Sequence, residues 1–491
     1  MPRTWPAVGL LATAALGDAT LRSARLFLTE QALCRRYYAR YDPAVPAPDG
    51  RVDEQHCKLD VIQAELSMIL GVFEAITFLV GLLATPLTTC LAPTIGLRKV
   101  MTVNVLMMSL GALYSSIVAL LPAAFDIRLI WLTGFFELIG GGTPSRNALL
   151  YIHLAEQISP DALSETLYRL STLIILMSFA GTSLGALLLS IDVWLLCSLG
   201  VGFCALGLLI VPFLQHRAWL EDFAVSATTP LIHTAVPSVL HSAPVVEAAQ
   251  PRAWKEAAVW ALDSSRVEGY HSESVLSSLL QNRVTLVTML MYMCNETAIY
   301  IRVAFPQWAS KVFAWTLAEV NAVTAFQILV NGFVLLSLPL LTKWLLLPCL
   351  SSQRMVDHWV IQSSLLCNTI GLVLISIAPT RWLYIMALGL YSLGAALPDS
   401  LRSIMTSSLQ DESQLQKVYT GISMVEAVAG LAGTTIWSTT FAAGLQYGGT
   451  SLAGLCFIAA AGLFALSLHM TSVLKDLTVG KSAIVVNVSE P

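Results

Sequence analysis

Three charged residues interrupt the first apolar stretch of the chain and could do chemistry inside a membrane. Asp18, Arg22 and Arg25 stand within residues 6–30 at spacings i, i+4 and i+7, which place them within an arc of about 60° on one helix face. Asp before Arg at this spacing favours an ion pair. Because an unpaired charge in the bilayer costs at least ~2.5–3.5 kcal/mol, we expect this face to point into the protein. A cleaved signal peptide is the competing interpretation, since a basic residue, an apolar run and small residues also fit one.

Other charged residues lie within later apolar stretches. Four carboxylates could contact a substrate or accept a proton, or could instead hold helices together as structural pairs or reach the membrane interface. These are Glu74, Glu137, Glu296 and Glu426. Asp399 and Arg402 stand at i, i+3 near the end of one stretch, and for them we expect a structural pair.

The elements that must position these residues are membrane helices. Hydrophobic residues make up 56% of the 491 residues and charged residues 12%, whereas soluble domains carry roughly 25% charged residues. A spanning helix needs about 20 mostly apolar residues. We therefore expect an all-α membrane protein with twelve transmembrane helices, at 6–30, 61–85, 99–121, 128–150, 166–190, 194–214, 284–305, 316–341, 358–378, 381–404, 418–441 and 450–472.

The twelve stretches divide into two halves of six. A polar segment rich in Ser, Ala, Pro and Val separates them, so we expect an N-terminal bundle, a cytoplasmic linker, a C-terminal bundle and a cytoplasmic tail at 1–214, 215–282, 283–475 and 476–491. The halves also share short motifs at one offset. Pro86 matches Pro339, Pro144 matches Pro398 and Ala180 matches Ala432, with 339 − 86, 398 − 144 and 432 − 180 giving 253, 254 and 252. Two related six-helix halves are typical of secondary transporters.

Basic residues in the loops predict the orientation. With the N-terminus inside, sixteen Lys and Arg lie on the cytoplasmic side, nine lie outside and two lie within a span, which favours this orientation. Seven of the nine cysteines lie in or beside apolar stretches, where a buried thiol is expected. Cys34 and Cys57 lie in the polar segment between the first two spans, and could form a disulfide if that segment faces an oxidising compartment.

Several motifs resemble a known family. They are Glu30-Gln-Ala-Leu-Cys34, Glu54-Gln-His-Cys57-Lys58, Gln307-Trp-Ala-Ser-Lys-Val-Phe-Ala-Trp315 and Tyr419-Thr-Gly-Ile-Ser-Met-Val-Glu426. With them the chain resembles the major facilitator superfamily over nearly its whole length, most closely its fungal members, which are distantly similar to proton-coupled folate-type carriers. The resemblance implies two pseudo-symmetric six-helix bundles and, since many such proteins belong to secondary-metabolite pathways, an exporter.

The chain departs from the superfamily pattern at two places. The loop between spans two and three keeps a glycine and the basic pair Arg98 and Lys99, which the resemblance assigns to gating or structure, but Pro93 stands where the superfamily has an aspartate. The fifth span lacks the Gly-Pro signature of antiporters, since Gly181-Thr-Ser-Leu-Gly185 has no proline. The resemblance therefore supports the fold more strongly than it supports proton antiport.

These patterns favour a secondary active transporter that moves a small organic molecule, with protons as the coupling ion. Export of a fungal metabolite is the leading hypothesis, and uptake of an organic anion attracted by Arg22 and Arg25 is the first alternative. A membrane-embedded enzyme or sensor is the second, but the sequence has no metal-ligand pattern, nucleophile elbow or nucleotide-binding loop. We expect no cofactor and no nucleic-acid partner, and a monomer in the lipid bilayer of the cell membrane or of the vacuole.

Overall fold

The structure is a computed structural model that describes residues 4–42, 52–157, 160–214, 283–346, 348, 353–407 and 412–487. These residues form helices joined by short turns, and no strand occurs among them. The predicted linker at 215–282 lies outside the described residues. The fold is therefore all-α, as predicted from the composition.

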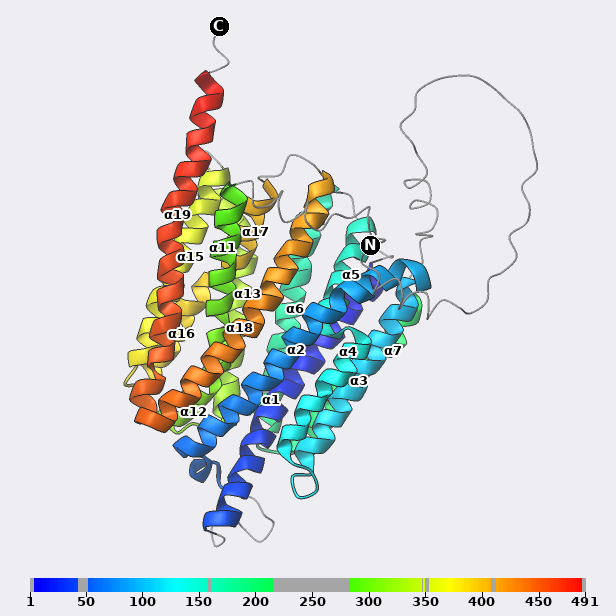
Figure 1. The fold of residues 1–491 in the computed structure, drawn as a ribbon, viewed down its shortest axis with the longest axis vertical. Coiled ribbons are helices and arrows are strands. Elements are labelled where there is room, and N and C mark those ends of the chain that lie inside the picture. The colour runs from blue at the N-terminus through cyan, green and yellow to red at the C-terminus, as the bar shows by residue number, and fades with distance from the viewer. Residues whose placement is uncertain are drawn as a thin grey trace, which may run out of the picture.

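The described helices form an N-terminal and a C-terminal half (Figure 1). The N-terminal half contains α1 (Trp5–Tyr41), α2 (Asp60–Ile95), α3 (Leu97–Leu120), α4 (Thr133–Gly140) continued by α5 (Gly142–Gln157), α6 (Pro160–Leu188) and α7 (Val193–Ile210). The C-terminal half contains α11 (Arg283–Ile299), α12 (Phe305–Phe313), α13 (Leu317–Leu341), α15 (Gln353–Ile377), α16 (Arg381–Ser392) continued by α17 (Leu397–Ser407), α18 (Glu412–Ala453) and α19 (Leu455–Asn487). Short 3-10 helices include η1 (Glu54–Lys58), η2 (Ile127–Leu132), η3 (Val211–Phe213), η4 (Tyr300–Val303) and η6 (Leu393–Ala396), and a short π-helix, η5 (Thr342–Leu346), follows α13.

Seven of the described helices are long and apolar enough on their own to cross a membrane. They contain Asp60–Thr89, Leu97–Leu120, Arg169–Leu188, Val193–Phe213, Leu317–Trp344, Met355–Ile377 and Leu455–Ser472. Among the other crossings, α1 carries Asp18, Arg22 and Arg25 within its apolar part, and two crossings are interrupted, at Gly141 and at η6.

Four elements differ from the predicted spans. Helix α1 continues to Tyr41 and α2 to Ile95, beyond the apolar residues of each span. The segment before the eighth span, where we expected no helix, forms α12. Helix α19 continues to Asn487, through the residues that we assigned to a tail. Hydropathy locates the part of a helix in lipid, but a helix can continue into the polar region.

The internal repeat has a structural counterpart at its glycines. Gly141, with φ +89°, ends α4 at the first motif, and η6 interrupts the matching crossing of the second half. A Cβ on Gly181 would lie 2.7 Å from the Leu16 carbonyl oxygen of α1, and one on Gly433 would lie 2.7 Å from the Thr297 carbonyl oxygen of α11. In each half, one repeated motif thus interrupts a crossing, and the other contains a glycine that lets two helices pack closely.

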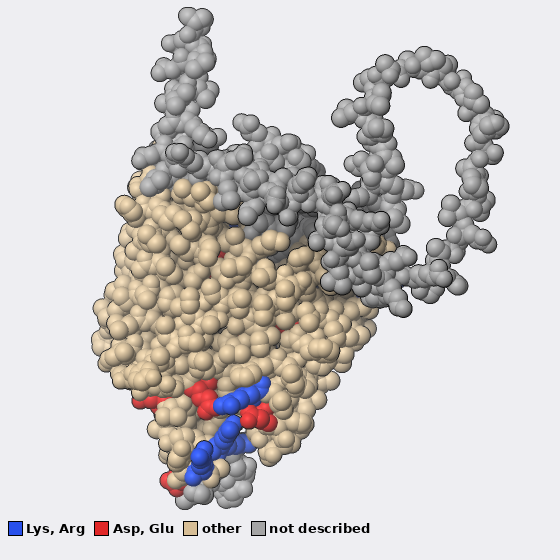
Figure 2. Space-filling view, in the orientation of Figure 1, with Lys and Arg blue, Asp and Glu red and all other residues tan. Residues whose placement is uncertain are grey.

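The two halves pack against each other through α2 with α18 and α6 with α13 (Figure 1). Charged side chains gather at one end of the molecule, beside a broad surface without them (Figure 2). Because η1 lies at this charged end, we call it the η1 end; α1 begins and α19 ends at the opposite end (Figure 1). An uncharged belt of this kind is the surface that a bilayer would cover.

Candidate functional site

The charged face of α1 forms the predicted ion pair, but the pair is not buried. Asp18 Oδ2 lies 3.2 Å from Arg22 Nη2, and the side chains are 57% and 67% exposed. Arg22 interacts electrostatically with Glu74 of α2 and with Tyr300 of the C-terminal half. The charged face points into the protein, as expected, since Asp18 and Arg25 line an internal cavity and Arg22 interacts with residues of both halves, but the Asp18–Arg22 pair itself is exposed. Because the Asp18 and Arg22 side chains are exposed, water can solvate them and the cost of burial is avoided.

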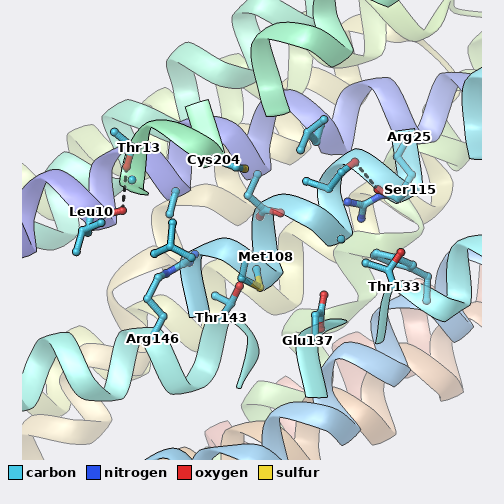
Figure 3. A pocket seen from close by; sticks show the side chains of 18 residues that line it. Leu10, Thr13, Arg25, Met108, Ser115, Thr133, Glu137, Thr143, Arg146 and Cys204 are labelled. Atoms are coloured by element: carbon cyan, nitrogen blue, oxygen red, sulfur yellow. Dashed lines mark hydrogen bonds between the residues drawn. The ribbon is translucent and has the colours of Figure 1, made fainter. Parts of the chain in front are cut away.

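Arg25 points in a different direction from Arg22. Its guanidinium lies over the ring of Phe73, 4.0 Å from the ring centroid, and it lines a cavity inside the N-terminal half (Figure 3). The cavity has a volume of about 60 Å³ and is formed by α1, α2, α3, α4, α5 and α7. Asp18, Glu137 and Arg146 also line it. A space of this size holds a few water molecules but is too small for an organic substrate.

Two polar atoms in this cavity have no hydrogen-bond partner among the described residues. One is Oε2 of Glu137, a residue that is only 7% exposed. The other is Oγ1 of Thr133, one helical turn earlier. The other oxygen of Glu137 lies 3.5 Å from the hydroxyl of Thr77. Buried polar atoms without protein partners usually bind water. The cavity therefore has the properties of a hydrated pocket with a carboxyl group available to a proton.

A second group of charges lies in the C-terminal half. Arg402 of α17 forms an ion pair with Asp399 at 3.1 Å, as predicted, and also one with Glu426 of α18. The same guanidinium donates to the hydroxyl of Tyr292 on α11 at 2.9 Å, and that hydroxyl donates to Glu426. Glu426 therefore has the partner that its own helix does not supply. The group joins three helices, so a change at Arg402 would act on all of them.

Tyr300 connects the charges of the two halves. Its hydroxyl interacts electrostatically with Glu296, Glu426 and Arg302 of its own half and with Glu74 of α2. The ring packs edge-on against Phe78 of α2 at 4.9 Å between centroids. The predicted residues therefore form two groups, and an aromatic pair across the boundary between the halves lies where the groups approach each other.

Other predicted residues lie away from these groups. Arg98 donates to the carbonyl oxygen of Leu214 through Nε at 3.2 Å and Nη2 at 2.7 Å, so it fastens the end of α7 within one half. Lys99 is exposed beside it. Cys34 and Cys57 form a disulfide at the η1 end. Arg98 and the disulfide therefore hold segments of the N-terminal half together.

Four residues of these groups, Arg146, Tyr292, Tyr300 and Arg302, were not among the predicted site residues. Arg146 follows the Gly-Gly-Gly-Thr-Pro motif within an apolar stretch, so an ionisable residue inside a span was a usable signal. Arg302 ends another such stretch. Tyr300 carried no signal, because a tyrosine near a helix end is usually an interfacial residue.

Comparisons with known proteins agree with the fold. No family model matches the chain. A protein of Emericella nidulans named MFS efflux pump atnC is 23% identical over 457 residues, which cover 92% of this chain and 83% of the relative. A protein of Aspergillus flavus named efflux pump ustT is 22% identical over 430 residues, covering 87% and 79%.

Solved structures give the same answer. The human organic anion transporter MFSD10 matches with a TM-score of 0.57 and 16% identity, covering 96% of this chain and 100% of its own. The E. coli xylose transporter XylE, in a partially occluded inward-open conformation, matches with a TM-score of 0.55 and 12% identity, covering 95% and 98%. These named relatives and neighbours are transporters, which speaks against an enzyme. The chain is thus a multi-pass membrane protein with the major facilitator fold, and it resembles the fungal efflux members of that superfamily.

Proposed function

We propose that this chain is a secondary active transporter that exports a small organic molecule, a fungal secondary metabolite, by alternating access. The observation that carries the proposal is that each half contributes a group of charged residues, and that the two groups approach each other at Tyr300, at the boundary between the halves. Arg22 and Asp18 contribute from one half, and Glu296 from the other. Such groups at the interface of two repeats provide polar contacts for a substrate near the bilayer midplane.

We assign proton coupling to the cavity inside the N-terminal half. Glu137 presents an unpartnered carboxylate oxygen there, and Arg25 and Asp18 interact with it electrostatically. A proton on Glu137 would change the charge next to the Asp18–Arg22 pair, because Asp18 lies both in that pair and in the cavity wall. This arrangement would let proton binding alter the substrate space without the proton and the substrate sharing one site.

We further propose that the protein acts as a monomer in the plasma membrane, with both termini and the 215–282 segment in the cytoplasm. The η1 end would then face the outside. The basic residues of the loops support this orientation. The names of the fungal relatives support export.

Transport in inside-out plasma-membrane vesicles from an expressing yeast tests the proposal. The vesicles are offered a panel of small organic anions, cations and neutral compounds under an acid-inside gradient, and the internal contents are identified by mass spectrometry. We expect uptake of one chemical class that a protonophore abolishes. Glu137→Gln should lose gradient-driven uptake but retain exchange of the compound across the membrane. Met386→Leu, a change at a 71% exposed apolar side chain, serves as the control.

Three results would contradict parts of the proposal. Uptake in right-side-out vesicles under an acid-outside gradient, without the inside-out activity, would assign import instead of export. Normal gradient-driven transport by Glu137→Gln would remove the proton role from the cavity. The absence of movement of every compound in both vesicle types, with folded protein present, would overturn transport itself.

A further inference from the structure

Two motifs that the proposed pathway does not use lie against each other at the η1 end. One is Glu54-Gln-His-Cys-Lys58, which forms η1 in the N-terminal half. The other is Gln307-Trp-Ala-Ser-Lys-Val-Phe-Ala-Trp315, which forms most of α12 and its turn into α13 in the C-terminal half. Residues more than 250 positions apart in sequence thus meet at this end, as the contact of Leu317 with Glu54, 263 residues apart, shows.

Within its own half, η1 is fixed to α1 and α2. The disulfide joins Cys57 to Cys34 of α1. The ammonium group of Lys58 lies 2.7 and 2.9 Å from the two carboxylate oxygens of Glu30, and these side chains are 7% and 0% exposed. Gln63 of α2 donates to Glu30 at 2.6 Å and to the carbonyl oxygen of Cys57 at 3.0 Å. A covalent bond and a buried, hydrogen-bonded ion pair therefore fix η1 against α1 and α2.

Toward the other half, η1 makes contacts of a different kind. The carboxylate of Glu54 accepts from the backbone N–H of Leu317, at the start of α13, at 2.8 Å. The amide of Gln55 donates to the carbonyl oxygen of Ala314 at 3.0 Å, at a residue with φ +52° that ends α12. Lys311 donates to the carbonyl oxygen of Lys58 and forms an ion pair with Asp60 at 2.9 Å. These contacts are single hydrogen bonds or partly exposed charges that water can replace.

We propose that η1 is a latch that closes the outer side of the transporter by binding the α12–α13 turn, and that the Cys34–Cys57 disulfide keeps the latch in the shape that fits this turn. The inference rests on the proposed function, since a latch has a role only in a protein that opens alternately to each side. Glu54, Gln55 and Lys311 are then the gate residues. Reduction of the disulfide should loosen the latch and favour opening to the outside.

The accessibility of one introduced thiol measures the latch directly. Ser67 on α2 is 1% exposed and donates to the carbonyl oxygen of Ser438 on α18, so it marks the boundary between the halves close to the η1 end. Ser67→Cys is placed in a chain whose cysteines other than Cys34 and Cys57 are replaced by alanine or serine. Intact cells are then labelled from outside with a membrane-impermeant maleimide, and the labelling rate is recorded.

We expect slow labelling in this background and labelling about tenfold faster in Lys311→Met, because a hydrogen bond from a charged donor across the gate is lost. Arg128→Met is the matched control. Arg128 forms an ion pair with Glu65 at 2.8 Å at the same end, but both residues belong to the N-terminal half, so its loss should leave the rate unchanged. A Glu54→Ala variant should behave as Lys311→Met does.

Reduction tests the disulfide without a variant that could fail to fold. Brief treatment of the folded protein on cells with an impermeant reductant, removed before labelling, should raise the labelling rate of Ser67→Cys as Lys311→Met does, once the labelling of the released Cys34 and Cys57 thiols, measured in the same chain without Ser67→Cys, is subtracted. Unchanged rates in Lys311→Met, in Glu54→Ala and after reduction would overturn the latch. Equal acceleration by Arg128→Met would do so as well, because the effect would then be general loosening. Labelling as expected, together with no transport in vesicles, would leave the gate supported and the proposed function contradicted, so the two failures can be told apart.

Discussion

Replacement of Glu30 by glutamine should destabilise the protein far more than replacement of Asp18 by asparagine. Both changes remove the negative member of an ion pair on α1. The Glu30–Lys58 pair is almost fully buried, with side chains 0% and 7% exposed, so the change leaves a buried ammonium group uncompensated, at a cost of ~3–5 kcal/mol. The Asp18–Arg22 side chains are more than half exposed, and pairs of that kind contribute ~1 kcal/mol or less.

Equilibrium unfolding of the purified protein in mixed detergent micelles measures the difference. We expect Glu30→Gln to lower the free energy of unfolding by several times as much as Asp18→Asn. The double change Glu30→Gln with Lys58→Met should recover most of the loss, because an apolar replacement removes the buried charge as well. Equal effects of the two single changes, within about 1 kcal/mol, would refute the reasoning from burial.

Three further outcomes follow from the structure. Gly141→Ala should lower the free energy of unfolding by about 1 kcal/mol or more, because the residue has φ +89° and its Cβ would lie 2.7 Å from Thr88; unfolding in the same micelles checks this. Gly181→Val should reduce the yield of monodisperse protein on size-exclusion chromatography, and Gly202→Val, where a Cβ meets no atom within 4 Å, should not. Reporter fusions at the two termini should both report the cytoplasm, and opposite sides would contradict the twelve-span topology.

Local features of the site could be predicted from the sequence. The Asp18–Arg22 pair follows from a spacing of four on one helix. The Asp399–Arg402 pair follows from a spacing of three. The exposure of the first pair could not be predicted, because the periodicity places the charges on a common face but does not say how tightly other helices pack against that face.

Contacts between distant helices could not be predicted in the same way. Tyr292, Arg402 and Glu426 come from three helices, and a single sequence gives no information on which helices are neighbours. The repeat offset gave the matching breaks at Gly141 and η6, since both motifs contain glycines that end or interrupt helices. The contact of η1 with α12 had no such signal. It depends on how the halves lie relative to each other.

The distribution of strong and weak contacts at the η1 end suits a reversible gate. The strong contacts, the disulfide and the buried Glu30–Lys58 pair, lie within one half and need not break during transport. The contacts that η1 and the start of α2 make with the α12–α13 turn are those of Glu54, Gln55 and Lys311. At ~0.5–1.5 kcal/mol for each hydrogen bond, they contribute a few kcal/mol together. That matches the scale of ~5.5 kcal/mol that moves an equilibrium from 1:99 to 99:1. A covalent bond or a buried ion pair between η1 and the α12–α13 turn would stabilise the closed gate by more free energy than substrate and proton binding could offset. Without any contact between them, nothing at this position would hold the outer side closed.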